Sequence, residues 1–137
     1  RDDVESRGLG DVYKRQGLLS RIPVFEIKQI VNIKKVDKME TFDDIIKGDK
    51  PVLVDFFATW CGPCKVLSPT VEALGKELAG QVRVLKIDVD KNEALATQLR
   101  IQSVPTLIIF KKGEIVWRSS GVMDHGSLLR KAQSYID

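Results

Sequence analysis

The sequence predicts an α/β domain, and three observations support this prediction. Short apolar segments alternate along the chain with longer segments of helical periodicity. The apolar segment Pro51–Ala58 is continuous, as in a strand covered on both faces. Directly after it, Cys61 and Cys64 stand in a C-x-x-C pattern at the start of a helical segment. Strands that alternate with helices favour a sheet between helical layers.

Length and composition are those of one soluble domain. The chain has 137 residues, 43% of them hydrophobic and 30% charged, which allows one substantial core. Residues 1–38 hold nine Lys/Arg and six Asp/Glu, and so carry the whole net charge of +3. The remaining residues are neutral overall, which gives no reason to expect a nucleic-acid partner. No apolar run approaches the roughly 18 residues of a membrane span, so no membrane association is expected.

Residues 1–29 are predicted to be an N-terminal arm outside the domain, either disordered or not native. Residues 1–16 show no clear periodicity, and their last part resembles translated adapter read-through. Residues 17–29 are ambiguous between a linker and a remnant of upstream coding sequence. The domain itself is predicted to span residues 30–137.

The first half of the domain is predicted as strand, helix, strand and long helix. Ile30–Val36 serves as the first strand, and Thr41–Lys47 forms a short helix with Thr41 or a neighbour as its cap. Pro51–Phe57 is the second strand. The long helix runs from Cys61 to Ala79, and Pro69 inside it predicts a kink.

The second half alternates in the same way and ends with a hairpin and a helix. A helix over Glu93–Leu99 is capped by Asn92 or Asp90, and residues 111–114 form the hairpin turn. The remaining elements are strands at Val82–Asp88, Thr106–Phe110 and Ile115–Trp117 and a last helix from Asp124 to Gln133.

The two cysteines are interpreted as a redox dithiol. A cysteine at a helix start faces unpaired N–H groups and the positive end of the dipole, so the Cys61 thiolate is stabilised. Cys64 follows by about one turn, close enough for a disulfide. Pro63 suits the first turn because it lacks an N–H group. A zinc site would need four ligands, and the only histidine, His125, is distant in sequence. A c-type haem is excluded because Lys65 follows Cys64. No metal is therefore expected, and a metal ion bridged between two chains is the remaining alternative.

Asp55 departs from the apolar pattern of its strand. Burial of a carboxylate is costly and raises its pKa, so its position six residues before Cys61 suggests a chemical role. We interpret Asp55 as the acid/base group for the Cys64 proton. The alternative is an aspartate that faces solvent.

Residues 54–65, Val-Asp-Phe-Phe-Ala-Thr-Trp-Cys-Gly-Pro-Cys-Lys, resemble the active-site segment of the thioredoxin family. Further similarity lies at Lys86–Asp90, Ile101–Phe110, Lys112–Glu114 and Gly121, so the resemblance covers about residue 30 to the end. It implies a thioredoxin fold: a central five-stranded mixed sheet flanked by four helices. The last two strands would run antiparallel to the rest.

The resemblance also assigns expected roles outside the cysteine pair. Lys86 would lie near Asp55 and tune it, the alternative being an ordinary surface lysine. The bond before Pro105 would be cis and face the active site, with the Val104 backbone pairing with an extended substrate segment; a trans proline at a strand edge is the alternative. A flat apolar docking surface would comprise Trp60, Gly62, Pro63, Val104, Pro105, Gly121 and Val122.

By this resemblance the protein is a protein-disulfide reductase, with Cys61 as the nucleophile and Cys64 as the resolving thiol. It would bind no cofactor and would take electrons from NADPH through thioredoxin reductase. Its partners would be that reductase and disulfide-containing target proteins, and it would act as a cytoplasmic monomer in electron transport and cell redox homeostasis. Two alternatives stay open: an oxidant or isomerase of a secretory compartment, and a binding module that uses the apolar surface.

Overall fold

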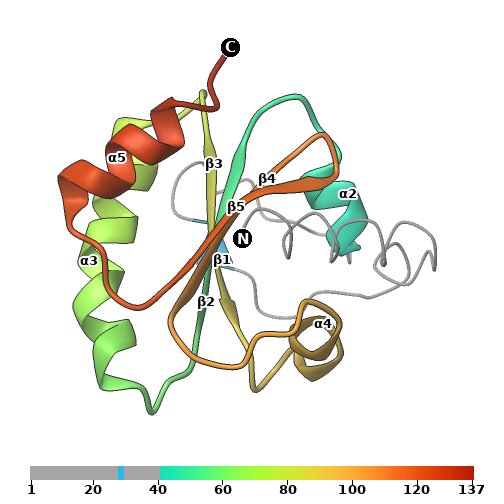
Figure 1. The fold of residues 1–137 in the computed structure, drawn as a ribbon, viewed down its shortest axis with the longest axis vertical. Helices are drawn as coiled ribbons and strands as arrows, with labels where there is room; N and C mark the ends of the chain where they lie inside the picture. The colour runs from blue at the N-terminus through green and yellow to red at the C-terminus, as the bar shows by residue number, and fades with distance from the viewer. Residues whose placement is uncertain (1–27, 30–40) are drawn as a thin grey trace.

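The computed structural model describes residues 28–29 and 41–137, which are built around a five-stranded sheet of order β1-β3-β2-β4-β5 (Figure 1). The strands are β1 Lys28–Gln29, β2 Val52–Phe57, β3 Arg83–Asp88, β4 Thr106–Lys111 and β5 Glu114–Ser120. The helices in this part of the chain are α2 Phe42–Ile46, α3 Gly62–Glu77, α4 Glu93–Gln98 and α5 His125–Gln133. The predicted strand Ile30–Val36 lies outside the described residues.

The sheet is mixed, as expected, but one expected strand direction is wrong. β2 and β3 are parallel, and β4 runs antiparallel to β2. β5 is antiparallel to β4 and therefore runs in the direction of β2, because the short turn between them reverses the chain. Four strands have six or seven residues, and the fifth is the two-residue edge strand β1, antiparallel to β3. The sheet thus has five strands, but β1 lies within the predicted arm of residues 1–29 and is not the predicted first strand Ile30–Val36.

Helices cover both faces of the sheet. In Figure 1, α3 and α5 lie on one side and α2 and α4 on the other. The α2/α4 face buries a core around Phe42, Phe56 and Phe110, whereas the α3/α5 face buries a second core around Leu53 and Leu107. β2 contributes to both cores because successive side chains of a strand point to opposite faces. The strand that precedes the cysteines is thus held on both sides.

Local sequence signals account for several element ends. The side chains of Thr41 and Asp124 each accept a backbone N–H of the helix that follows, as N-caps do. Asn92 occupies the predicted cap position of α4 without a side-chain capping bond, and its amide instead donates to the Asp88 carbonyl. Lys112 and Gly113 have φ values of 54° and 81°, which suit the two-residue turn of the β4–β5 hairpin. The predicted helix and strand boundaries in the described part hold to within a few residues.

The long helix starts where the sequence predicts. α3 begins directly after Cys61 and continues to Glu77, with Pro69 inside it on the exposed side. None of the described helices has both the length and the apolar character needed to cross a membrane.

Candidate active site

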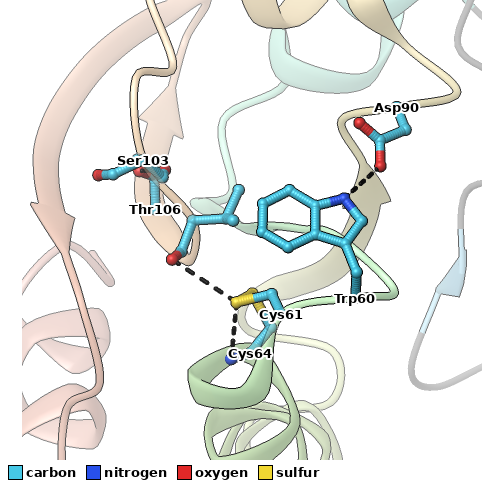
Figure 2. The surroundings of a disulfide bond; sticks show 7 residues. Trp60, Cys61, Cys64, Asp90, Ser103 and Thr106 are labelled. Atoms are coloured by element: carbon cyan, nitrogen blue, oxygen red, sulfur yellow. Dashed lines mark hydrogen bonds between the residues drawn. A yellow bond between two sulfur atoms is a disulfide. The ribbon is translucent and has the colours of Figure 1, made fainter.

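The two cysteines form a disulfide at the N-terminus of α3. Their Cα atoms are 5.3 Å apart. Cys61 is the N-cap residue of the helix, and its Sγ accepts the backbone N–H of Cys64 at 3.2 Å (Figure 2). Through this bond, the Cys64 peptide dipole and the positive end of α3 act on the sulfur of Cys61 and not on that of Cys64. Cys61 and Cys64 are buried to a similar degree, at 4% and 3% exposed, so the position on the helix rather than burial distinguishes them.

A turn before β4 faces the disulfide. The Val104–Pro105 peptide bond is cis, as the resemblance implies, and the Val104 carbonyl oxygen lies 3.6 Å from the Sγ of Cys61 (Figure 2). A disulfide sulfur carries no proton, so this approach is a contact in the oxidised protein, whereas a Cys61 thiol is able to donate there. The Gly121 N–H donates to the Pro105 carbonyl at 2.9 Å. The end of β5 and the turn are therefore fixed beside Cys61.

The turn is also fixed by Thr106, a residue that sequence reasoning did not single out. Its buried hydroxyl donates to the Ser103 carbonyl at 2.7 Å, across the two residues of the cis bond. The Ser120 hydroxyl lies 3.4 Å from the same hydroxyl oxygen of Thr106. A threonine at the start of a strand is common, so its sequence carried no distinct signal.

Exposed apolar groups surround the cysteines. Trp60 is 71% exposed, and its indole Nε1–H donates to the Asp90 carboxylate at 2.8 Å (Figure 2). Val122, after β5, is 49% exposed. Of the other residues predicted for the docking surface, Gly62 and Pro63 are exposed, Val104 and Gly121 are half-buried, and Pro105 is buried. The Val104 carbonyl contacts Cys61, and Gly121 is hydrogen-bonded to Pro105, so the two loops that carry part of this set lie beside the helix start.

Asp55 is fully buried on the face of β2 that also carries Leu53. In the register of the sheet it lies between Lys86 of β3 and Leu107 of β4. Neither carboxyl oxygen has a hydrogen-bond partner among the described residues. Burial raises the pKa of Asp55 to about 7, and the nearby positive charge of Lys86 offsets this only in part. The solvent-facing alternative is therefore wrong, and the carboxyl is poised to exchange a proton near neutral pH.

Lys86 is half-buried and interacts with α3. Its Nζ donates to the Ser68 hydroxyl and lies 5.0 Å from the centroid of the Phe57 ring, a cation–π distance. The alternative of an ordinary surface lysine is therefore wrong. Ser68 was not predicted, because a serine inside a helix has no distinctive pattern.

No group of three or more metal-ligating side chains of the kind His, Cys, Asp or Glu occurs in residues 28–29 and 41–137. His125, at the start of α5, lies 2.8 Å from a carboxylate oxygen of Glu77 on α3 and away from the cysteine pair in sequence. Among the described side chains, the cysteine pair is the group with redox chemistry, and Asp55 is a buried carboxyl on the strand before it.

This geometry defines a class of protein. A strand with a buried carboxyl leads here into a disulfide at a helix N-terminus, and a cis-proline turn faces one of the two sulfurs. These are the parts of a dithiol–disulfide redox site.

Comparison with known proteins agrees with this class. The family model described as thioredoxin matches residues 32–134. A thioredoxin-like protein of Synechocystis is 48% identical over 96 residues, which cover 69% of this chain and 91% of that protein. A bifunctional thioredoxin reductase/thioredoxin of Mycobacterium leprae is 45% identical over 89 residues, covering 65% of this chain and 19% of that longer protein. A solved structure of a mutant thioredoxin from Halobacterium salinarum matches with a TM-score of 0.65 and 41% identity, covering 71% of this chain and 84% of that one.

The chain belongs to the thioredoxin family. It is a thiol–disulfide oxidoreductase, and its Cys61–Cys64 pair fits the reduction of disulfides through cycling between dithiol and disulfide.

Proposed function

We propose that this protein reduces disulfides in other proteins with Cys61 as the attacking thiolate and Cys64 as the resolving thiol. The observation that carries the assignment is the N–H of Cys64, which donates to the Sγ of Cys61 at the start of α3. A negative charge on Cys61 would be stabilised by this N–H and by the helix dipole. Cys64 lies inside the first turn, where its own sulfur does not occupy the cap position.

In the first step the reduced Cys61 thiolate attacks one sulfur of the target disulfide. A bond forms between Cys61 and that sulfur, the target S–S bond breaks, and the other target sulfur leaves as a thiolate. The target chain lies along the Val104 carbonyl, which is 3.6 Å from the Cys61 sulfur and therefore borders the reacting bond. The exposed Trp60 and Val122 give the target apolar surface to contact.

In the second step Cys64 loses its proton and attacks the Sγ of Cys61. The mixed disulfide breaks, the second target thiolate leaves, and the Cys61–Cys64 disulfide forms. Overall, two electrons pass from the protein to the target. Asp55 accepts the Cys64 proton, because its raised pKa of about 7 allows it to hold a proton at neutral pH.

The oxidised protein then requires an external reductant. We propose a flavin-dependent thioredoxin reductase that uses NADPH, with the domain acting as a cytoplasmic monomer without a bound cofactor. The Mycobacterium leprae relative supports this source of electrons, because its name joins thioredoxin reductase and thioredoxin in one chain.

The experiment is NADPH-coupled reduction of insulin disulfides with a heterologous thioredoxin reductase. We expect the full chain to sustain NADPH oxidation with insulin present and Cys61→Ser to abolish it. Cys64→Ser should stall as a mixed disulfide, because no resolving thiol remains. In the reduced parent protein, iodoacetamide at neutral pH should label Cys61 much faster than Cys64.

A matched trapping experiment tests the two roles. Cys64→Ser and Cys61→Ser are incubated with oxidised insulin, and the covalent adducts are separated on non-reducing gels. Equal trapping by the two variants, or faster labelling of Cys64, would show that the roles are assigned wrongly. Insulin reduction by a Cys61→Ser/Cys64→Ser double variant would show that the cysteines do not carry the activity.

A further inference from the structure

The interaction between Ser68 and Lys86 joins the long helix to the strand next to the buried carboxyl of Asp55. Lys86 and Asp55 are register neighbours on parallel strands, so their side chains leave the same face of the sheet. That face is covered by α3, which supplies Ser68. The Lys86 ammonium donates to the Ser68 hydroxyl and lies over the Phe57 ring. These two contacts fix where the positive charge stands.

The position of the ammonium matters because it makes no hydrogen bond to Asp55, its register neighbour on β2. Both oxygens of Asp55 are buried without a hydrogen-bond partner in the described part of the chain, although Lys86 leaves the neighbouring strand on the same side. An ammonium that reached the carboxyl would form a buried ion pair. The contacts of Lys86 with the Ser68 hydroxyl and the Phe57 ring are the interactions that compete with such a pair.

We propose that Ser68 is a positioning residue that holds Lys86 away from Asp55 and so keeps Asp55 able to accept a proton near neutral pH. The inference deepens the proposed function and rests on it, because it explains how the acid/base group of the site is kept ready. Ser68 supplies the hydroxyl acceptor and Phe57 the ring face. Together they offer a half-buried ammonium an alternative to the carboxyl.

The groups that bear on the titration of Asp55 belong to three elements. On β3, Asp88 leaves the same face as Lys86; it is buried, and its carboxylate accepts the backbone N–H of Asp90 at 2.9 Å. Lys86 on β3 is the charged group whose field lowers the pKa of Asp55, against the larger effect of burial, which raises it. The register neighbour on β4 is the apolar Leu107. At the start of α3, Cys61 and Cys64 titrate only in the reduced protein, since a disulfide has no proton to lose. The oxidised protein therefore isolates the interaction between Lys86 and Asp55.

The test is an NMR titration of the Asp55 carboxyl carbon in the oxidised full chain. In Ser68→Ala, Lys86 loses its acceptor and pairs with the carboxyl, so we expect the titration midpoint to fall by about one pH unit, a tenfold loss of proton affinity. Ser68→Thr keeps a hydroxyl at the same position and should restore the parent midpoint. Thr70→Ala on the same helix is the matched control and should leave the midpoint unchanged.

The same Ser68 substitution in a Lys86→Met protein shows whether Ser68 acts through Lys86. Lys86→Met removes the positive charge and should raise the midpoint, and Ser68→Ala added to Lys86→Met should then change nothing further. A midpoint that stays constant or rises in Ser68→Ala would overturn the proposal, as would an equal fall in the Lys86→Met background. The titration involves no reductase and no target, so its failure is distinguishable from a failure of insulin reduction.

Discussion

The two faces of the sheet are built differently, although the same strand supplies both. Towards α2 and α4, β2 presents Val54 and Phe56 to a core of apolar side chains, where Phe42 and Phe110 meet edge to face at 5.1 Å. Towards α3 and α5, it presents Leu53 and then Asp55, a carboxyl with no exposed surface. One face therefore only packs, and the other also holds a group that is costly to bury.

This difference separates what stabilises the fold from what serves its chemistry. On the α2/α4 face the buried core lowers the free energy of the folded state through apolar burial. On the α3/α5 face the carboxyl at position 55 opposes folding whenever it is charged, and it stands on the strand that leads to Cys61. Adjacent residues of one strand should therefore respond in opposite ways to substitution.

The largest expected effect on stability is on the α2/α4 face. Phe56 has no exposed surface, and Phe56→Ala removes its apolar burial and leaves a cavity, which should lower the free energy of unfolding by about 3–5 kcal/mol. Urea unfolding followed by circular dichroism measures this loss. Insulin reduction per folded molecule should stay close to the parent value. A fall in that specific activity much larger than the loss of folded protein would show that the two faces are not separable.

The neighbouring substitution Asp55→Asn should stabilise the fold, with a defined pH dependence. The pKa of Asp55 is raised from 3.8 to about 7 in the folded protein, so folding takes up a proton between these values and stability falls as pH rises through that window. Below about pH 4 the carboxyl is neutral in both states and the penalty vanishes. At pH 8 the full penalty, about 4 kcal/mol, is present, and Asp55→Asn should recover up to that amount.

Unfolding curves for parent and Asp55→Asn at pH 4 and pH 8 measure this difference. The variant should be distinctly more stable at pH 8 and nearly equal to the parent at pH 4. Its insulin reduction should be slower by at least about tenfold, because the Cys64 proton loses its acceptor. A stability gain that is the same at both pH values would mean that the charge of Asp55 is not its cause. Unchanged turnover would end its catalytic assignment.

The residues that pack the core were easier to predict from the sequence than the contacts that serve the chemistry. Buried packing produces a regular apolar pattern that is visible in the sequence. The apolar run of β2 and the cap residues Thr41 and Asp124 therefore predicted where their strand and helices lie. Asp55 could be recognised as a candidate site residue because it interrupts the apolar pattern of its strand. The contact between Ser68 and Lys86 was not, since it depends on how a helix and a strand distant in sequence are placed.

The direction of the last strand shows a different limit. The hairpin was predicted from the turn around Lys112 and Gly113, yet the resemblance suggested that both last strands oppose the rest. A two-residue turn reverses the chain once more, so β5 returns to the direction of β2. The direction of β5 therefore follows from the hairpin itself.

The smallest expected effect is at a helix end on the α2/α4 face. The Thr41 hydroxyl oxygen accepts the Asp44 N–H at 3.3 Å at the start of α2, and Thr41→Ala should cost about 1 kcal/mol of stability through loss of this cap. Because α2 covers the face without the carboxyl, the titration of Asp55 and the rate of insulin reduction should not change. Thr41→Ser, which keeps the hydroxyl, should recover most of the loss in urea unfolding.

The cap of α5 on the opposite face is built in a similar way. Asp124 accepts the Ser127 N–H at 3.0 Å, and hydrogen bonds from Ser127 hold the pKa of Asp124 below its ordinary value. Its contribution is therefore present at neutral pH and lost as pH falls through the lowered pKa. The cap of α2 has a similar charged part, because the Thr41 hydroxyl donates to the Asp44 carboxylate at 2.8 Å and holds the pKa of that carboxyl below its ordinary value. If Thr41→Ala changed the pH midpoint of the Asp55 titration, a change on the α2/α4 face would affect the carboxyl on the other face. The two faces of the sheet would then not be independent.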